Sequence, residues 1–467
     1  MIGLDARMLC VRTLIRSIRS KSYSNLTLTN ALMQAEEISP PDSALCKRIF
    51  RGVLERMLTL DACIAAHSKR PPEKLDLEVC CVLRCGIYEL LYLHTPESAA
   101  VNLWTEAVKK LKKTSAAGMV NAVLRGFIRG GKAIPVPKDV RGAMSVQYSV
   151  PAELLDALLS DYDTETVKAF LEDADDAPPI YFRRNPLCEN SENKIPRAEE
   201  VPGIPYAYII KKRGESAEVP TVIGGQETVP LDPYRSGFFD ESKALGNSSM
   251  HVQDLASQLC CLALDPQPGE TVLDVCAAPG GKSFTIAELM QDQGHVYSYD
   301  LHEKRVWLIR QGAEKLKLSC ITAQTGDARK TEKPQADRIL CDVPCSGFGV
   351  IRRKPEIRYK PLDEVSGLPE IQYAILEASA EALKPGGVLV YSTCTVLKRE
   401  NEDVVRRFLA VHPEYTLEKP WQNYPALAAY GQEMTTLFPQ MLGSDGFFIA
   451  KMRKTDISDS RQPYPNG

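Results

Sequence analysis

Residues 271–282 read Thr-Val-Leu-Asp-Val-Cys-Ala-Ala-Pro-Gly-Gly-Lys, an apolar run that passes into a turn with adjacent glycines. Val272, Leu273 and Val275 suit a strand that is buried on both faces of a sheet. The turn at 279–281 allows a ligand to approach bare backbone, because glycine has no side chain. The stretch predicts a strand, a ligand-binding turn and a helix. An ordinary strand-to-helix turn is the alternative, since the G-x-G-x-x-G pattern of dinucleotide sites is absent.

Acidic residues follow the first strands of this region. Asp274 lies at the carboxyl end of the first strand, where open α/β sheets bind their ligands. The next expected strand, 295–300, ends at Asp300, about 20 residues past the glycines, where a carboxylate meets the hydroxyl groups of a ribose. This spacing predicts a cofactor that contains a ribose.

A cysteine follows each of two later strands. The strand 337–342 is followed by Val-Pro-Cys-Ser-Gly, and the strand 387–392 by Thr-Cys-Thr. In a parallel sheet the carboxyl ends of these strands share one edge with the glycine turn. Asp342, Cys345 and Cys394 are therefore expected to converge on whatever binds there.

Strands and helices alternate through the carboxyl-terminal half, which predicts a doubly wound α/β sheet. The expected strands are 271–276, 295–300, 319–323, 337–342, 387–392 and 446–452, and the expected helices are 282–291, 303–316, 368–384 and 399–410. Before them, Val252-Gln253-Asp254 predicts a cap and a helix that enters this domain. The polar residues 454–467 are expected to form a disordered tail.

The amino-terminal residues 1–135 are expected to be helical. Apolar residues recur three and four positions apart and line one helix face: Leu4, Met8, Val11, Ile15 and Ile18. The arginines between them also fit a mitochondrial presequence, but the pattern continues without a break into helices expected at 42–67, 76–93, 97–113 and 116–129. A folded helical domain is the preferred interpretation.

The middle of the chain carries fewer signals. The segment 130–137, with glycine and proline, predicts a linker. A small α+β domain is expected over 145–245, with a strand at 178–185. The polar stretch 189–233 permits no chemical assignment.

Charge divides the 467 residues unevenly, although the net charge is only −3. Residues 1–150 contain 22 Lys and Arg against 13 Asp and Glu, a net charge of +9, which leaves −12 for the rest. A basic domain joined to an acidic one indicates that a polyanionic partner binds to the basic domain. The alternative is that the basic side chains only lie on helix faces exposed to solvent. The 14 cysteines form no C-x-x-C pair, which indicates reduced thiols and no bound metal.

Three motifs together resemble a known family: Ala-Ala-Pro-Gly-Gly-Lys, Asp-Val-Pro-Cys-Ser-Gly and Ser-Thr-Cys-Thr, in that order. They resemble the RNA cytosine-5 methyltransferases that use S-adenosylmethionine, and most of all the bacterial RsmB (Sun, Fmu) family, which acts on small-subunit (16S) ribosomal RNA. Residues 120–127 are similar to the closing helix of the NusB-like RNA-binding domain of that family. The resemblance implies an all-α NusB-like domain (1–135), a small α+β RNA-facing subdomain (145–245), a Rossmann-like methyltransferase domain (246–453) and a tail (454–467).

The resemblance also implies a cofactor site. The methionine end of S-adenosylmethionine is expected against one loop, formed by Cys276, Ala277, Ala278, Pro279, Gly280, Gly281 and Lys282. Asp300 is expected to bind the ribose and Asp327 the adenine amino group. Asp342 is expected to border both cofactor and base, with Lys282 orienting it.

Methylation at carbon 5 of cytosine requires a nucleophile at carbon 6, and a thiolate suits this task. A carboxylic acid beside N3, here Asp342, makes the ring more electrophilic. The resemblance assigns Cys394 as the nucleophile and Cys345 as an assistant in product release, whereas DNA cytosine methyltransferases use the cysteine of the Pro-Cys pair. A buried, inert thiol is the common alternative for any cysteine.

Basic residues after the Pro-Cys motif predict RNA contact near the site: Arg352, Arg353, Lys354, Arg358 and Lys360. In the helical domain, Asn121 and Arg125 share a helix face and fit either RNA contact or a solvated surface.

The sequence therefore predicts a cytosine-5 methyltransferase for small-subunit ribosomal RNA. It is expected to be a cytoplasmic monomer that uses S-adenosylmethionine, without metal or membrane span. Transfer RNA is the alternative substrate. The alternative class is a non-catalytic RNA-binding or antitermination factor on a methyltransferase scaffold. The presence of both cysteines and Asp342 disfavours this alternative.

Overall fold

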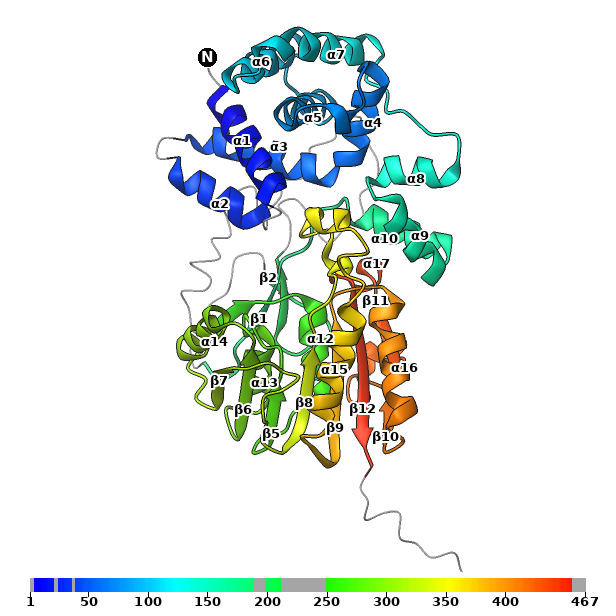
Figure 1. The fold of residues 1–467 in the computed structure, drawn as a ribbon. Helices are drawn as coiled ribbons and strands as arrows, with labels where there is room; N and C mark the ends of the chain where they lie inside the picture. Colours follow the sequence, from blue (N-terminus) through cyan, green and yellow to red (C-terminus); the bar gives the residue numbers. More distant parts are fainter. Residues whose placement is uncertain (1–3, 21–23, 36–37, 189–197, 211–248, 456–467) are drawn as a thin grey trace, which may run out of the picture. The chain divides into compact units, whose positions relative to one another are not determined.

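The computed structural model describes residues 4–20, 24–35, 38–188, 198–210 and 249–455 (Figure 1). The chain forms two compact units. The helical unit contains Met1–Asp175 together with Arg353–Lys360, and the sheet unit contains Asp176–Arg352 and Pro361–Gly467. None of the helices within the described ranges is long and apolar enough to cross a membrane.

The helical unit begins with a bundle that confirms the predicted helical character of the amino-terminal region. Its helices are α1 (Leu4–Ser20), α2 (Ser24–Gln34), α3 (Pro40–Glu55), α4 (Met57–His67), α5 (Leu77–Tyr92), α6 (Glu97–Lys110) and α7 (Ala117–Arg129). Helix α5 packs against α1, α3, α4, α6 and α7 and is buried along most of its length. This central position explains why most residues of α5 are apolar, with Glu78, Arg84 and Glu89 as its charged residues.

The predicted single helix over 42–67 is wrong, because the chain breaks at Arg56 between α3 and α4. Arg56 has φ −120° and ψ 23°, outside the helical region. Its guanidinium group donates to the carbonyl of Gln147 at 3.0 Å and pairs with Asp175 at 2.8 Å. These tertiary contacts accompany a break that local sequence does not signal.

A buried carboxylate lies in the core of this bundle. Glu89 is fully buried and accepts hydrogen bonds from Arg7 Nε at 2.9 Å and Trp104 Nε1 at 2.7 Å. A buried charge is tolerated only when it is paired and hydrogen-bonded in this way. The contacts tie α1 and α6 to the central helix α5.

The helices α8 (Val140–Tyr148), α9 (Ala152–Asp161) and α10 (Thr164–Asp173) also belong to the helical unit. Thr59 of α4 donates to the carbonyl of Val146 at 2.6 Å, and the backbone N–H of Leu58 donates to Ser149 Oγ at 2.9 Å. These contacts explain why the structure divides the chain after Asp175 instead of at the predicted boundary near residue 145.

The short segment Arg353–Lys360 joins the helical unit from far along the sequence. Arg358 Nη1 donates to the carbonyls of Glu55 and Tyr148, which end α3 and α8, at 3.0 Å each. The hydroxyl group of Tyr359 accepts the backbone N–H of Met57 at 3.1 Å. The chain therefore leaves the sheet unit after Arg352 and returns to it at Pro361.

Two glycines of the helical unit provide a matched test of backbone conformation. A Cβ atom added to Gly118 or to Gly131 would meet no heavy atom within 4 Å, but only Gly131 has a positive φ, of +70°. We expect Gly118→Ala to raise the free energy of unfolding by about 0.5–1 kcal/mol, because it restricts the unfolded chain. Gly131→Ala should lower it by about 1 kcal/mol, because the left-handed conformation disfavours a side chain. Urea unfolding of both variants checks the prediction, and two changes of the same sign would contradict it.

The sheet unit is built on the predicted doubly wound sheet, whose order is β10-β12-β9-β8-β5-β6-β7, from right to left in Figure 1. The parallel strands are β5 (Thr271–Asp274), β6 (His295–Asp300), β7 (Ile321–Thr325), β8 (Ala336–Asp342) and β9 (Leu383–Thr393). Strand β12 (Phe447–Lys454) is antiparallel to β9, and it also pairs with β10 (Tyr415–Glu418) and β11 (Met434–Leu437). The sequence analysis does not predict β10 and β11, which contain four residues each.

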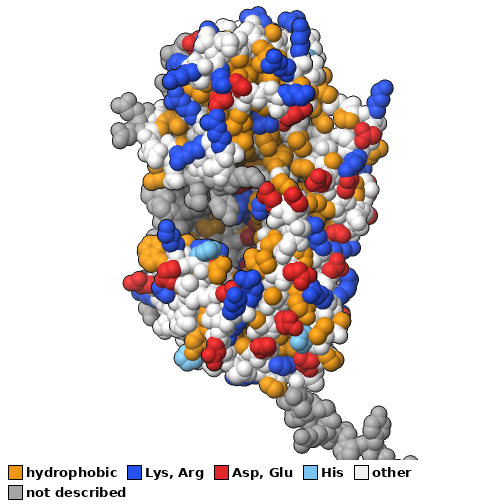
Figure 2. All heavy atoms as spheres, viewed as in Figure 1, with side chains coloured by type: hydrophobic (Ala, Val, Ile, Leu, Met, Phe, Trp, Pro, Cys, Tyr) orange, Lys and Arg blue, Asp and Glu red, His pale blue; other side chains and the backbone are white. Residues whose placement is uncertain are grey.

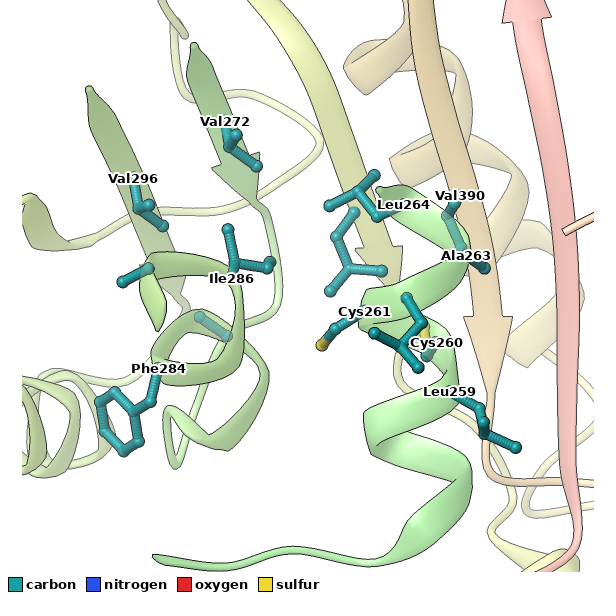
Figure 3. Close-up of a cluster of buried hydrophobic side chains, with 14 of the residues drawn as sticks. Leu259, Cys260, Cys261, Ala263, Leu264, Val272, Phe284, Ile286, Val296 and Val390 are labelled. Carbon is teal, nitrogen blue, oxygen red and sulfur yellow. The ribbon is translucent and has the colours of Figure 1, made fainter. Parts of the chain in front are cut away.

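Helices cover both faces of this sheet. Helices α12 (Leu255–Leu264), α13 (Gly281–Leu289) and α14 (Glu303–Leu316) share one core with Val272, Val296 and Val390. Figure 3 shows the buried thiols of Cys260 and Cys261 within this core. Helices α15 (Leu368–Ala380) and α16 (Glu402–Val411) share a second core with strand residues of the opposite face. The sheet thereby becomes the middle layer of three.

A second, smaller antiparallel sheet has the order β2-β3-β1-β4. Its strands are β1 (Tyr181–Arg184), β2 (Ala198–Glu200), β3 (Ala207–Ile210) and β4 (Met250–Val252). Strand β1 lies within the predicted strand 178–185. After β4, Asp254 caps α12 by accepting the backbone N–H of Ala256 at 2.9 Å, as the sequence predicts. Residues 189–197, 211–248 and 456–467 lie outside the described residues. They include most of the polar stretch 189–233 and most of the predicted tail 454–467.

Candidate active site

A cavity of about 220 Å³ lies where β5 passes into α13. It is lined by Val252, Gln253, Asp254, Ser257, Asp274, Cys276, Ala277, Ala278, Pro279, Gly281, Lys282 and Asp342. These include the predicted cofactor loop except Gly280. At Gly280, φ is +115°, and an added Cβ would lie 2.5 Å from the Phe284 ring, so only glycine fits the turn.

Asp342, at the end of β8, borders the cavity beside Lys282. Lys282 Nζ donates to one carboxylate oxygen of Asp342 at 2.8 Å, and Ser392 Oγ donates to the other at 2.9 Å. Burial lowers the pKa of Lys282, but the Asp342 carboxylate and the nearby thiols of Cys260 and Cys261 together raise it, so that its pKa lies above the usual value. Lys282 therefore remains charged and holds Asp342 in one orientation.

Asp274 is a cavity residue that the sequence places at a ligand-binding edge without assigning it a role. Its side chain is fully buried and accepts Ser283 Oγ at 2.7 Å. Burial raises the pKa of Asp274 to about 7 against the opposing effect of this hydrogen bond. The other carboxylate oxygen has no hydrogen-bond partner among the described residues. A cationic ligand in the cavity would stabilise the ionised form of Asp274.

Asp300, the predicted ribose-binding residue, ends β6 but is not among the residues that line the cavity. One carboxylate oxygen accepts the backbone N–H of His302 at 3.1 Å, and the other pairs with Arg305 at 3.2 Å. Arg305 also donates to the carbonyl of Ala278 in the cofactor loop at 2.6 Å. Arg305, which the sequence did not single out, thus connects the predicted ribose and methionine positions.

Asp327, the predicted adenine-binding residue, follows β7 and also lies outside the cavity lining. Arg329 donates to both of its carboxylate oxygens, at 2.9 and 2.7 Å. These hydrogen bonds lower the pKa of Asp327 to about 2. Asp327 is thus held as a carboxylate, which can accept a hydrogen bond from an amino group.

The structure brings the cysteines of the two motifs together. Cys345 follows β8 and Cys394 follows β9, and their Sγ atoms lie 3.0 Å apart, within hydrogen-bond distance. The hydrogen bond with Cys394 and burial raise the pKa of the Cys345 thiol well above its usual value. Cys345 therefore stays protonated and can donate to Cys394.

The cavity residues fit S-adenosylmethionine. The methionine end of this cofactor carries a sulfonium and an ammonium group, and the carboxylates of Asp274 and Asp342 border the cavity. The unpartnered oxygen of Asp274 can accept a hydrogen bond from the ammonium group. Carboxylates in a partly closed site favour such a cation.

The structure contradicts two of the predicted RNA contacts. Arg352 is only 4% exposed, and its guanidinium group donates to the carbonyls of Gly443 and Ser444. Arg358 is 1% exposed and donates within the helical unit. The prediction of phosphate contact is therefore wrong for both, because backbone carbonyls engage their buried guanidinium groups. Arg353 and Lys360 are partly buried, and Lys354 is exposed.

The other predicted RNA contacts lie on α7. Arg125 is exposed and donates from Nε to Asn121 Oδ1 at 3.0 Å, so the two residues share a helix face as predicted. Blue Lys and Arg side chains gather over the helical unit, at the top of Figure 2. No group of His, Cys, Asp and Glu suited to holding a metal ion occurs in the described part of the chain.

Two family descriptions match this chain. Residues 261–453 match "16S rRNA methyltransferase RsmB/F", and residues 4–129 match the NusB family. The crystal structure of PH0851 has the same fold, with a TM-score of 0.75 at 24% identity, and the comparison covers 96% of this chain and 99% of that one.

Relatives of known name match nearly the whole length. The "Probable ribosomal RNA small subunit methyltransferase B" of Bacillus subtilis (strain 168) is 35% identical, over 96% of this chain and 99% of the relative. The "Ribosomal RNA small subunit methyltransferase B" of Yersinia pseudotuberculosis is 30% identical, over 94% of this chain and 98% of the relative. The chain therefore belongs to the ribosomal RNA small subunit methyltransferase B (RsmB) family.

Proposed function

We propose that this protein transfers a methyl group to carbon 5 of a cytosine in 16S ribosomal RNA, through a covalent bond between Cys394 and carbon 6. The observation that carries the proposal is the pair of cysteine sulfurs, 3.0 Å apart at the strand ends beside Asp342. S-adenosylmethionine is the cofactor of the family and supplies the methyl group as an electrophile. The loop at 276–282, Asp300 and Asp327 would hold it.

The reaction assigns a separate task to each side chain. The Cys394 thiolate adds to carbon 6, and this makes carbon 5 nucleophilic. Asp342, which Lys282 and Ser392 hold in place, acts in its protonated form when the cytosine is bound. It donates its proton to N3 as the thiolate adds to carbon 6, so that no negative charge builds up on the ring, and it takes the proton back when the adduct breaks down.

After methylation, loss of the proton from carbon 5 to water allows the bond between carbon 6 and sulfur to break. The electron pair returns to Cys394. The Cys345 thiol, protonated and within hydrogen-bond distance, donates to the departing sulfur and thereby assists release.

Ribosomal RNA is the proposed substrate because both named relatives bear that substrate in their names. Transfer RNA is the alternative within the same chemistry. The close cysteine pair disfavours a non-catalytic RNA-binding factor, which would have no use for it. We further propose that the protein acts as a cytoplasmic monomer, with Asn121, Arg125, Arg353 and Lys354 as RNA contacts.

The test uses tritiated S-adenosylmethionine, unmodified small-subunit RNA and the full chain. We expect Cys394→Ala to abolish both methyl transfer and covalent trapping of RNA, because it removes the nucleophile. Cys345→Ala should instead accumulate a protein–RNA adduct that survives a denaturing gel, because release is impaired. Sequencing after bisulfite treatment identifies the methylated position.

Cys188→Ala is the matched control, since Cys188 lies outside the cavity and both cysteine loops. It should methylate RNA at the wild-type rate. Loss of transfer in Cys345→Ala without an adduct, together with trapping by Cys394→Ala, would reverse the two roles. Labelling of transfer RNA alone would favour the alternative substrate, and no labelling by the wild type would favour the non-catalytic factor.

A further inference from the structure

The two cysteines lie on loops whose positions depend on side-chain contacts. Strand β8 ends at Asp342 and β9 at Thr393, so Cys345 and Cys394 both stand beyond the hydrogen-bond ladder of the sheet. A shift of either loop would change the sulfur–sulfur distance on which the proposed chemistry depends. The residues that hold these loops are therefore part of the site.

Glu400 holds the loop of Cys345. One oxygen of its fully buried carboxylate accepts the backbone N–H of Ser346 at 2.8 Å and the side-chain amide of Gln372 at 3.0 Å. The same amide nitrogen of Gln372 donates to the carbonyl of Pro344 at 3.0 Å. The residues on both sides of Cys345 are thus tied to Glu400, directly or through Gln372.

Asn401, the next residue, holds the loop of Cys394 in a parallel way. Its side-chain oxygen accepts Thr393 Oγ1 at 2.6 Å, and its side-chain nitrogen donates to the carbonyl of Thr395 at 3.0 Å. Thr393 and Thr395 flank Cys394, and both are fully buried. The amide of Asn401 thus spans the residue that carries the proposed nucleophile.

Direct contacts join the two cysteine loops to each other and fix the dipeptide Glu400-Asn401 to the sheet. Ser346 Oγ donates to Thr395 Oγ1 at 2.8 Å, and Tyr391 of β9 donates its hydroxyl group to the carbonyl of Glu400 at 2.6 Å. The other carboxylate oxygen of Glu400 is buried without a hydrogen-bond partner among the described residues. Because such burial is unfavourable, its retention favours a specific task for Glu400. The contacts of Glu400 on one loop match those of Asn401 on the other.

We propose that Glu400 and Asn401 are positioning residues that set the distance between the two cysteine loops, Glu400 for Cys345 and Asn401 for Cys394. This inference rests on the roles assigned to the cysteines under the proposed function. It extends the site from the strand ends to the segment that precedes α16. The two adjacent residues should therefore fail in opposite ways when they are replaced.

The test compares single-residue variants of the full chain by methyl transfer and by covalent trapping of RNA. Glu400→Ala should lower kcat by about 100-fold and accumulate the RNA adduct, because misplacement of Cys345 impairs release. Asn401→Ala should lower methyl transfer by about 100-fold without adduct, because misplacement of Cys394 impairs attack. KM for S-adenosylmethionine should change little in both, since neither residue lines the cavity.

Conservative variants separate positioning from general instability. Glu400→Gln retains an oxygen that can accept from Ser346 and should recover most of the rate lost in Glu400→Ala. Gln372→Met removes the contact with Pro344 while Glu400 stays in place, and it should also accumulate adduct. Glu402→Ala is the matched control: Glu402 is buried beside the dipeptide, and its carboxylate accepts from Thr436. This control should show the wild-type rate of methyl transfer and the wild-type amount of protein–RNA adduct.

Alkylation of the thiols by iodoacetamide, followed by mass spectrometry, provides a readout that does not depend on RNA chemistry. Glu400→Ala should change the labelling rate of Cys345 several-fold more than that of Cys394, and Asn401→Ala should do the reverse. The inference is overturned if both variants affect the two thiols equally, or if Glu402→Ala has the same effects. Failure of the reference variants Cys394→Ala and Cys345→Ala to differ in trapping would overturn the proposed function, while the labelling rates still decide the positioning role.

Discussion

Gly349→Ala is expected to destabilise the sheet unit by about 3 kcal/mol and to remove methyl transfer, because the substitution overpacks a contact between backbones. A Cβ atom on Gly349 would lie 2.0 Å from the carbonyl oxygen of Gly446 and 2.8 Å from that of Cys394. Both neighbours are backbone atoms and cannot rotate away. The N–H of Gly349 also donates to the carbonyl of Cys394 at 3.0 Å, so any relief of the clash displaces the proposed nucleophile.

Thermal unfolding and methyl transfer together check this result. Gly367→Ala is the matched control, because an added Cβ there meets no heavy atom within 4 Å and the φ of −84° is ordinary. It should melt and methylate like the wild type. A Gly349→Ala protein with an unchanged melting temperature and activity would show that this backbone contact yields more easily than the distances indicate.

Arg183→Met is expected to lower the free energy of unfolding by about 3–5 kcal/mol, because it leaves a buried carboxylate without its partner. Arg183 of the small sheet and Glu288 of α13 are both fully buried, and Arg183 Nε donates to Glu288 at 2.6 Å. Urea unfolding monitored by circular dichroism measures the change.

The double variant Arg183→Met/Glu288→Gln should recover much of the lost stability, because it removes the uncompensated charge as well. Arg406→Met is the surface control. Arg406 and Asp403 are each 60% exposed, and the loss of such a pair should cost about 0.5 kcal/mol or less. If the double variant is no more stable than Arg183→Met, lost packing and not the charge of Glu288 explains the effect.

Local patterns were sufficient to predict the central sheet. The alternation of apolar strands with helices predicted β5, β6, β8 and β9. Short apolar runs flanked by turn residues are typical of buried strands, and this is why the prediction succeeded. The strand ends also indicated that Cys345 and Cys394 would meet, because parallel strands present their carboxyl ends at one edge.

The contacts that complete the site could not be predicted in the same way. Arg358 and Lys354 look alike in sequence, yet Arg358 is buried and Lys354 is exposed. Arg358 donates to carbonyls at the ends of α3 and α8, which are remote in sequence. Glu400 likewise accepts hydrogen bonds from Tyr391 of β9 and Gln372 of α15. Which polar side chains become buried is decided by tertiary contacts, and local sequence does not record them.

The segment Arg353–Lys360 has a consequence for how this protein can be divided. A gene fragment that encoded only residues 176–467 would still include this segment but would lack the helices on which it packs. Arg358 would then have lost the carbonyls of Glu55 and Tyr148, in a stretch that begins only a few residues after Cys345. The helical unit is therefore not a detachable module, because it includes residues 353–360, which lie in the sequence between the two proposed catalytic cysteines. Exchange of amino-terminal domains between relatives would have to preserve the contacts of residues 353–360 with the helices.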